Sequence, residues 1–454
     1  MRLVVVGGDA AGMSAAAQAR RRRTSDELEI IAFELGSYTS YSACGLPYLV
    51  SGEVADEEAL VARSPEEHRA RGIDVRLRHE VIAIDVDTRT VTARDLDAGR
   101  DVIEPFDELV IATGATPFRP PLPGADAQGV HGIQTMADGL ALRDHLARHA
   151  AAHRRAVVVG CGYVGLEMAD AMRTRDLDVT VVDRNPHPMT TLDPDMGKLV
   201  HEALRGIGID VRTETHVEAF ETDNDGHVRA VVTDQGSLPA DVVVLGLGVR
   251  PNADLARNAG IRIGPTGAIA TDDHMATSIE RVWAAGDCAE TYHRLTGRPA
   301  YIALGTHANK QGRIVGVNAT GGDEIFGGVI GTAITKVCAY EIGRTGLSET
   351  EAIALGLDFV HATIESTTRA GYYPGTQPIT VKMLAERGSG RVLGAQIIGR
   401  EGAAKRIDVA ATAIWAGLTV HDVVHLDLGY APPFSSVWDP VLTAARRVVA
   451  RLEE

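Results

Sequence analysis

The sequence predicts an α/β fold in which one parallel-sheet pattern occurs twice and a smaller α+β domain follows. Three observations predict this class. An apolar run, a glycine-rich loop and an alanine-rich stretch open the chain. The same pattern at residues 4–12 returns 153 positions later, at 157–165. From Gly331 onward, alternating strands with two amphipathic helices replace it.

The composition is that of an ordinary globular protein. Its 454 residues suggest about three domains, and 45% of them are hydrophobic. A net charge of -16, with one short basic run at 20–23, argues against nucleic acid and anionic membrane surfaces as partners. No apolar run reaches the ~18 residues that span a bilayer, and the chain opens directly on a strand, so no signal peptide is expected.

The cysteines also limit the possibilities. Four of them are scattered, without a CxxC pair or a zinc-like spacing with histidine, and these are Cys44, Cys161, Cys288 and Cys338. The sequence therefore predicts a cytoplasmic protein without a metal. Cys161 is expected to be simply a small residue of the second glycine-rich loop, Cys288 to be buried, and Cys338 to be a core residue in a strand.

The first nucleotide-binding pattern begins with a strand at 3–6, and a helix follows to about Arg22. Gly7 permits the tight turn, Gly12 permits close helix–strand packing, and the helix start can accept a pyrophosphate. A second strand at 28–33 ends at Glu34, which suits a ribose hydroxyl. Asp9 stands where a middle glycine usually lies.

The second pattern repeats each of these parts. Gly160, Gly162 and Gly165 form the loop, and a strand ends at Asp183. Two copies, each with a terminal acid, predict two dinucleotide sites. Asp183 favours the free 2′-hydroxyl of NADH, whereas its neighbour Arg184 could accept the 2′-phosphate of NADPH. NADH is the preferred interpretation.

Shorter elements join and follow the two copies. The sequence predicts a capped helix at 64–67, a meander of strands at about 73–78, 81–86 and 90–96, strands at 108–112, 242–246 and 281–287, and a helix at about 299–320. The proline-rich stretch 117–124 indicates a domain boundary.

The segment Ser40–Tyr48 carries the most informative cysteine. Cys44 precedes a helix start, because Pro47 suits a first helical turn. A thiol at a helix N-terminus faces unpaired N–H groups, which favour the thiolate. The alternative is a buried cysteine that acts as a small hydrophobic residue.

These features resemble the FAD-dependent pyridine nucleotide–disulfide oxidoreductases over essentially the whole chain. The resemblance implies an FAD-binding domain at 1–116 and 246–322, an NAD(P)H-binding domain at 117–245 and a homodimerisation domain at 323–454. It implies FAD contacts from Gly7, Ala10, Ala11, Gly12, Glu34, Thr113, Gly114 and Asp287. It implies NAD(P)H contacts from Gly160, Gly162, Tyr163, Val164, Gly165, Glu167, Asp183 and Arg184; Glu167 could equally be an ordinary acid on a helix face.

Within that family, the chain resembles the single-cysteine branch of NADH peroxidase, NADH oxidase and coenzyme A disulfide reductase. No second cysteine lies about five residues from Cys44, and no His-Pro-Thr motif stands near the end. In the peroxidase and oxidase, a histidine of the first loop hydrogen-bonds a cysteine sulfenic acid. Ala10 occupies that position here, which argues against peroxide or oxygen as the main acceptor.

The coenzyme A branch has positive support. Residues 44–48, 371–375 and 430–434 resemble its cysteine motif and its two tyrosine motifs. Gln18, Arg21 and Ser40 match positions that contact coenzyme A in that branch, although Ala43 replaces an asparagine. The resemblance thus implies substrate contacts from Gln18, Arg21 and Ser40, and proton donation by Tyr372 or Tyr373, with Tyr430, from the partner subunit.

The implied reaction passes hydride from NAD(P)H to FAD, and two electrons then reduce a mixed disulfide at Cys44. Coenzyme A disulfide is the expected substrate, and persulfides are a close variant. The alternatives are an NADH oxidase or peroxidase that cycles a Cys44 sulfenic acid, a flavin-level quinone reductase, and a non-enzymatic flavoprotein that binds partners according to its redox state.

Overall fold

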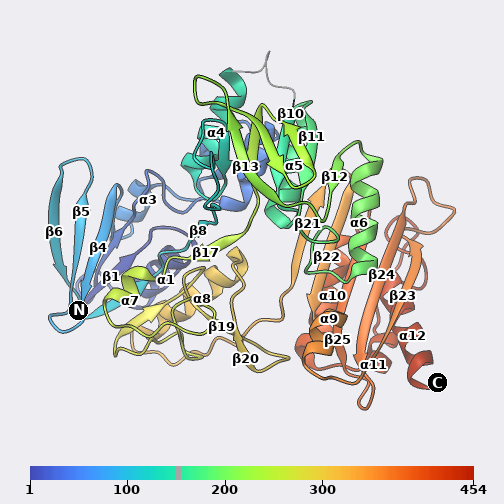
Figure 1. Ribbon diagram of the computed structural model, residues 1–454. Helices are drawn as coiled ribbons and strands as arrows, with labels where there is room; N and C mark the ends of the chain where they lie inside the picture. Colours follow the sequence, from blue (N-terminus) through green and yellow to red (C-terminus); the bar gives the residue numbers. More distant parts are fainter. Residues whose placement is uncertain (149–154) are drawn as a thin grey trace. The chain divides into compact units, whose positions relative to one another are not determined.

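Figure 1 shows the computed structural model, which describes residues 1–148 and 155–454. These residues divide into two compact units. Unit 1 comprises Met1–Phe118, Gln134–Asp144 and Val249–Val329. Unit 2 comprises Arg119–Ile133, His145–Gly248 and Ile330–Glu454. The division into three domains predicted from the sequence stays a prediction.

Unit 1 is built on a five-stranded parallel sheet. Its spatial order is β18 (Val282–Ala284), β7 (Glu108–Ile111), β1 (Arg2–Val6), β2 (Glu29–Phe33) and β3 (Ile73–Arg76). Strands β1 and β7 are almost entirely buried, as expected for a parallel sheet covered on both faces.

Two helices of unit 1 pack through small residues. Helix α1 (Ala10–Arg22) lies against α8 (Gly305–Asn318). A Cβ atom at Gly312 would lie 2.1 Å from the Ala11 carbonyl oxygen, and one at Gly316 would lie 2.4 Å from that of Ala15. The glycines of α8 therefore let the two helix backbones approach each other.

The remaining elements of unit 1 are short. The helical ones are η1 (Ala43–Gly45), α2 (Leu46–Ser51), η2 (Glu58–Leu60), α3 (Pro65–Arg69), the start of α4 (Met136–Arg148) and α7 (Asp254–Asn258). An antiparallel sheet consists of β4 (His79–Asp85), β5 (Thr90–Asp95) and β6 (Arg100–Pro105). Two strand pairs complete the unit: β8 (Ala115–Pro117) pairs with β17 (Val249–Pro251), and β19 (Thr291–His293) pairs with β20 (Arg298–Ala300).

Unit 2 contains a second parallel sheet with the same internal arrangement. Its order is β9 (Val130–Gly132), β16 (Val242–Leu245), β10 (Arg155–Val159), β11 (Asp178–Val182) and β12 (Asp210–Arg212). Strand β10 pairs with β11 and β16 as β1 pairs with β2 and β7. Helices α5 (Tyr163–Thr174) and α6 (Pro194–Gly206) and the small sheet β13 (Val217–Thr222), β14 (Val228–Thr233) and β15 (Gly236–Pro239) complete this part.

The C-terminal part of unit 2 is an antiparallel sheet with helices. The sheet order is β21 (Ala333–Val337), β22 (Tyr340–Gly346), β25 (Val392–Gly399), β24 (Pro378–Glu386) and β23 (Phe359–Thr367). The helical segments are α9 (Glu349–Ala354), η3 (Ala404–Arg406), α10 (Ile407–Ala416), α11 (Val420–Val424) and α12 (Pro440–Leu452).

The structure corrects four local predictions. The strand expected at 73–78 is β3, which joins the parallel sheet beside β2 instead of the meander, because the chain returns to the sheet edge through α3. The meander consists of β4, β5 and β6. Cys338 lies half-buried in the turn between β21 and β22 with φ 49°, not in a strand of the core. Helix α8 starts only at Gly305, and the two helices expected after 331 are four, two of them short. Cys288 is buried as predicted, and Cys161, predicted only to be a small residue of its loop, is buried as well.

Candidate active site

The loop between β1 and α1 has the geometry of a phosphate cradle. Gly7 has φ 110°, and a Cβ atom there would lie 2.1 Å from the Ala112 carbonyl oxygen. A Cβ atom at Gly12 would lie 1.9 Å from the Gly7 carbonyl oxygen. Only glycine fits both positions, as the sequence pattern required. Ala10 and Ala11 form the first turn of α1.

The loop between β10 and α5 repeats this geometry. Gly160 has φ 101°, and a Cβ atom there would lie 2.4 Å from the Gly246 carbonyl oxygen. A Cβ atom at Gly165 would lie 2.0 Å from the Gly160 carbonyl oxygen. At Gly162, an added Cβ atom would meet no atom of the described chain within 4 Å, so this part of the loop is open to a ligand.

The two strand-end acids hold the two loops in the same way. Glu34 accepts hydrogen bonds from the N–H groups of Gly8 and Gly36, both at 2.7 Å. Asp183 accepts them from the N–H groups of Cys161 at 2.7 Å and Asn185 at 2.8 Å. The repeat found in the sequence is therefore also a repeat of hydrogen bonds.

A cluster of acids marks the first site. Burial, followed by the charge of Glu34, raises the pKa of Asp9 to about 7, and Asp287 adds to the effect. Burial likewise raises the pKa values of Glu34 and Asp287. The fold thus brings together Glu34 and Asp287, which were predicted to contact FAD, with Asp9, which the sequence marked only as a departure from the fingerprint.

Two segments far apart in the sequence, at Thr113 and Asn252, are joined by hydrogen bonds at the end of β7. Thr113 follows β7, and its hydroxyl donates to the Asn252 carbonyl oxygen at 2.7 Å. The Asn252 amide donates back to the Thr113 carbonyl oxygen at 2.9 Å. Gly114 has φ 65°, a conformation that glycine adopts without strain. Thr113 and Gly114, both predicted to contact FAD, therefore lie in a segment that hydrogen bonds fix at the end of a sheet strand.

Tyr301 is a candidate that sequence reasoning missed. Its hydroxyl oxygen is buried and has no hydrogen-bond partner among the described residues. Burial raises its pKa, and the charge of Asp287 adds to this effect. A buried hydroxyl without a partner beside Asp287 indicates that a ligand completes the site. Together with the cradle at Gly7 and Gly12, it fits a bound FAD.

Cys44 is exposed in the short helix η1, immediately before α2, with Pro47 in the first turn of α2 as predicted. Its segment is hydrogen-bonded to the first loop. The Thr39 hydroxyl and the Ser40 N–H donate to the Gly8 carbonyl oxygen at 2.5 and 3.2 Å. The Tyr41 N–H donates to the Asp9 carboxylate at 3.2 Å. The candidate redox cysteine is thereby fixed to the loop predicted to bind FAD.

The predicted substrate residues of unit 1 have different environments. Arg21 donates to the Gln18 side chain at 3.2 Å on the exposed end of α1. Arg20, by contrast, donates to the carbonyl oxygens of Leu28 and Gly72. In the basic run, Arg20 therefore has a structural role, whereas Arg21 is exposed to solvent. Ser40 contacts His68, a buried residue that sequence reasoning missed; its Nε2 lies 2.9 Å from the Ser40 hydroxyl oxygen.

The two tyrosine motifs of unit 2 lie together. The Ala370 N–H donates to the Pro432 carbonyl oxygen at 3.1 Å and joins the two loops. Tyr372 and Tyr430 are 78% and 46% exposed. A hydrogen bond with Tyr372 raises the pKa of Tyr430. Tyr373 is half-buried, so Tyr372 is the more accessible hydroxyl of its motif.

The second loop carries the predicted NAD(P)H residues. Tyr163 and Val164 begin α5, and Arg184 is exposed beside Asp183. Glu167 accepts a hydrogen bond from the Thr335 hydroxyl at 3.0 Å, and burial raises its pKa. This contact with β21 makes Glu167 more than an acid on an exposed helix face.

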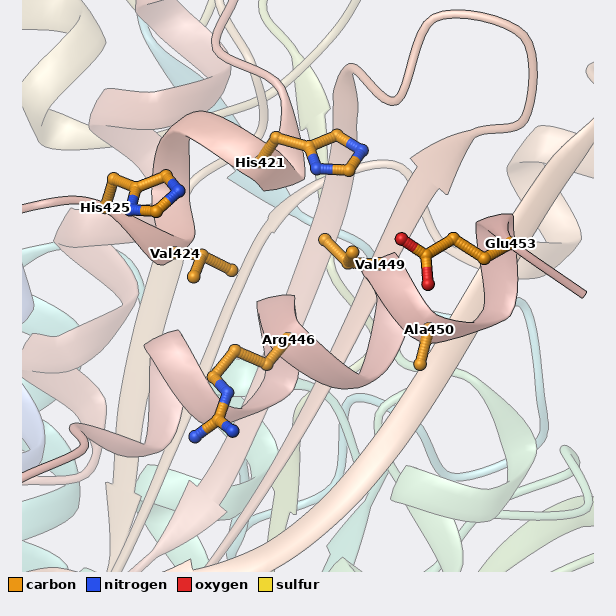
Figure 2. Close-up of a pocket in the computed structure, with 7 residues that line it drawn as sticks. All are labelled: His421, Val424, His425, Arg446, Val449, Ala450 and Glu453. Carbon is orange, nitrogen blue, oxygen red and sulfur yellow. The ribbon is translucent and has the colours of Figure 1, made fainter.

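Two further features of unit 2 contain none of these residues. The carboxylates of Asp193, Asp195 and Glu349 lie close enough to hold a cation, but the buried ammonium of Lys382 already forms ion pairs with all three. A cavity of about 330 Å³ lies between α11 and α12. Figure 2 shows that its polar side chains, His421, His425, Arg446 and Glu453, do not converge on one point.

Comparison with known proteins identifies the family. Residues 1–312 match the model of the pyridine nucleotide-disulphide oxidoreductases, and residues 332–441 match the dimerisation domain of that family. The chain is 40% identical to the CoA-dependent NAD(P)H sulfur oxidoreductase of Pyrococcus furiosus, over 98% of both chains. It is 35% identical to an NADH oxidase of Methanocaldococcus jannaschii, over 100% of this chain and 99% of that one.

Solved structures similar to this chain support the same family. The NAD-dependent persulfide reductase from A. fulgidus is 39% identical and superposes with a TM-score of 0.95, covering 100% of this chain and 84% of that one. The reduced CoADR-RHD of Bacillus anthracis is 32% identical, with a TM-score of 0.95 and 80% of its chain covered. No helix in the described ranges 1–148 and 155–454 is long and apolar enough to cross a membrane.

The chain therefore belongs to the pyridine nucleotide-disulphide oxidoreductases, flavoprotein enzymes that use FAD and NAD(P)H. The family, the fold class and the cofactors predicted from the sequence are confirmed.

Proposed function

We propose that this pyridine nucleotide-disulphide oxidoreductase is an NAD(P)H-dependent reductase of coenzyme A disulfide or a related low-molecular-weight disulfide or persulfide, acting through a mixed disulfide at Cys44. The observation that carries the proposal is the exposed Cys44 thiol on a segment hydrogen-bonded to the first phosphate loop. A thiol in that place can exchange with a disulfide from solvent. The relatives named for CoA-dependent sulfur reduction and persulfide reduction support the substrate class.

The first loop would hold FAD and the second NAD(P)H. Gly7 and Gly12 permit the tight turn and close backbone packing of a pyrophosphate-binding loop, and Glu34, Thr113, Gly114 and Asp287 lie at the same end of the first sheet. Gly162 offers the corresponding opening in the second loop. Bound FAD would supply two electrons, received from the nicotinamide as a hydride.

The chemical steps at sulfur can be assigned to residues of this chain. The Cys44 thiolate attacks one sulfur of the substrate disulfide, forms a Cys44–substrate disulfide and releases the other half as a thiolate. A proton from a tyrosine hydroxyl converts that thiolate to a thiol. Two electrons then cleave the mixed disulfide into two thiolates. Cys44 remains a thiolate for the next cycle, and the second half of the substrate takes up a proton from solvent and leaves as a thiol.

Tyr372 and Tyr430 are the candidates for the proton donor. They are exposed, lie in the part of the chain that matches the dimerisation domain of the family, and are near enough for Tyr372 to raise the pKa of Tyr430. We propose that the enzyme is a homodimer in which these hydroxyls serve the Cys44 site of the partner subunit. The cytoplasmic location stays a prediction from the cysteine pattern.

Asp183 supports NADH as the preferred nucleotide. Both of its carboxylate oxygens are held by N–H groups, so the negative charge stays at the end of β11, where it opposes a 2′-phosphate. Arg184 is exposed next to it and keeps NADPH as the alternative.

A Cys44→Ser substitution tests the proposal. We expect the variant to lose NADH-dependent reduction of coenzyme A disulfide, while NADH still bleaches the flavin absorbance. Cys338→Ser is the matched control, since Cys338 is half-buried in a turn of the other unit, and it should retain full activity. A Cys44→Ser protein that still reduced the disulfide would refute the mixed-disulfide scheme.

The second candidate is an NADH oxidase, favoured by the relative that carries this name. It predicts NADH consumption matched by oxygen consumption without any disulfide. We rank it second because Ala10, the first residue of α1, has no side-chain nitrogen or oxygen to stabilise a sulfenic acid.

A further inference from the structure

Ser40 is held rigidly in the cysteine segment. Its N–H donates to the Gly8 carbonyl oxygen at 3.2 Å, and its carbonyl oxygen accepts from the Ala62 N–H at 2.8 Å. Its φ is 50°, a left-handed conformation that a serine keeps only where the surrounding structure imposes it. The hydroxyl group is therefore the only part of Ser40 whose hydrogen-bond direction is open.

His68 decides that direction. It lies on α3, which begins at a capping box between Ser64 and Glu67, and its side chain is buried. Its Nε2 is 2.9 Å from the Ser40 hydroxyl oxygen. Its Nδ1 is buried and has no hydrogen-bond partner among residues 1–148 and 155–454.

The protonation state of this imidazole follows from its surroundings. Burial, together with the charges of Arg63 and Arg71, lowers the pKa of His68 to about 4, and the opposing charge of Glu67 is the weaker effect. At neutral pH the ring therefore carries a single N–H. A buried N–H without an acceptor is rarer in proteins than a buried acceptor without a donor. The proton consequently belongs on Nε2, where it has Ser40 as its acceptor.

We propose that His68 is a positioning residue that makes the Ser40 hydroxyl a hydrogen-bond donor toward the thiol cosubstrate. With Nε2–H donating to the Ser40 oxygen, the hydroxyl proton has to point elsewhere. That proton can then be donated to an acceptor group of the cosubstrate, such as an amide carbonyl or a phosphate oxygen. This inference rests on the proposed function for the identity of the cosubstrate, but the position of the proton does not depend on it.

The binding test uses the FAD-loaded full chain, with coenzyme A as the probe in calorimetric titrations. Ser40→Ala and His68→Phe should each weaken binding, by roughly tenfold at most for a single hydrogen bond. His68→Gln, whose amide can still donate to Ser40, should stay within about twofold of the wild type. The control Glu66→Gln, on the exposed side of the same helix, should bind as the wild type does.

The decisive variant combines Ser40→Ala with His68→Phe. If His68 acts through the hydroxyl, its substitution adds nothing once Ser40 is alanine. An equal loss in both backgrounds, or no loss from His68→Phe in the wild type, would overturn the proposal.

Neutron diffraction from the FAD-loaded protein tests the same claim without any variant. It should show a deuteron on Nε2 of His68, none on Nδ1, and the Ser40 deuteron directed away from the ring. A deuteron on Nδ1 would refute the inference even if coenzyme A binds. If the wild type bound no coenzyme A, the proposed function would fail while the neutron result still decided the role of His68.

Discussion

Two alanine substitutions in the second loop, at Gly162 and Gly165, should affect different properties: the first NADH binding, the second the stability of the fold. A Cβ atom at Gly165 would lie 2.0 Å from the Gly160 carbonyl oxygen, about 1 Å inside the closest ordinary approach. The backbone must move, at a cost of about 3 kcal/mol for such overpacking. A Cβ atom at Gly162 would meet no described atom within 4 Å, and the residue has φ −86°, which alanine accepts.

The two variants therefore separate folding from binding. Gly165→Ala should lower the free energy of unfolding by about 3 kcal/mol, measured by urea denaturation. Gly162→Ala should change it by less than about 1 kcal/mol. Its methyl group would instead occupy the opening for the pyrophosphate and weaken NADH binding by at least roughly tenfold, the loss of one charge-assisted hydrogen bond.

Stopped-flow measurement of flavin bleaching at varied NADH concentration gives the dissociation constant for NADH. Gly162 belongs to the second loop, and the equivalent position in the first loop is Asp9. Gly162→Ala should therefore leave the FAD content unchanged, and the FAD content of the variant serves as the control for its folding. A Gly162→Ala protein that folded normally and bound NADH as tightly as the wild type would refute the placement of the nucleotide at this loop.

Three further predictions concern the charged and hydroxyl groups of the sites. Burial and the charge of Glu34 raise the pKa of Asp9 in the folded protein to about 7, so the wild type should lose stability relative to Asp9→Asn as the pH rises from about 4 to 7. The expected loss in the free energy of unfolding is roughly 2 kcal/mol after screening by solvent. Urea unfolding of the FAD-free chain at several pH values measures this loss, and the same pH dependence of stability in both proteins would contradict the prediction. Asp183→Ala should shift the nucleotide preference from NADH toward NADPH by about tenfold, and the further change Arg184→Ala should reverse part of that shift. If NADH and NADPH reduced the flavin equally well in the wild type and in the variants, the role of Asp183 in choosing the nucleotide would be excluded. Tyr430→Phe should lower kcat for disulfide reduction by roughly a hundredfold at neutral pH without slowing flavin reduction by NADH. A loss confined to flavin reduction would exclude Tyr430 as the proton donor to the leaving thiolate.

The phosphate loops were predictable because their requirements are local. Gly7 and Gly160 adopt left-handed turns directly after a buried strand, and Gly12 and Gly165 meet the carbonyl oxygens of those same glycines. Strand, loop and helix follow one another in the chain, so a short window of sequence contains the whole motif. The burial of Cys288 was predictable for a similar reason, since this residue closely follows an apolar strand.

Contacts between distant segments were not predictable. Ser40 and His68 are 28 residues apart, and nothing in either local sequence indicates a hydrogen bond between them. The Tyr301 hydroxyl, which has no hydrogen-bond partner within residues 1–148 and 155–454, becomes evident only once the loop after β20 is placed near Asp287. The strand β3 was misassigned because strand periodicity does not state which neighbour a strand will pair with.

The central claim is that Cys44 forms a mixed disulfide with its substrate, and the mass of the intact chain tests it most directly. The protein, treated with coenzyme A disulfide and analysed without reductant, should be heavier by one coenzyme A. The adduct should map to the peptide containing Cys44, disappear on addition of NADH, and be absent from the Cys44→Ser variant. An unmodified or singly oxidised Cys44 after the same treatment would contradict the account and favour the oxidase alternative.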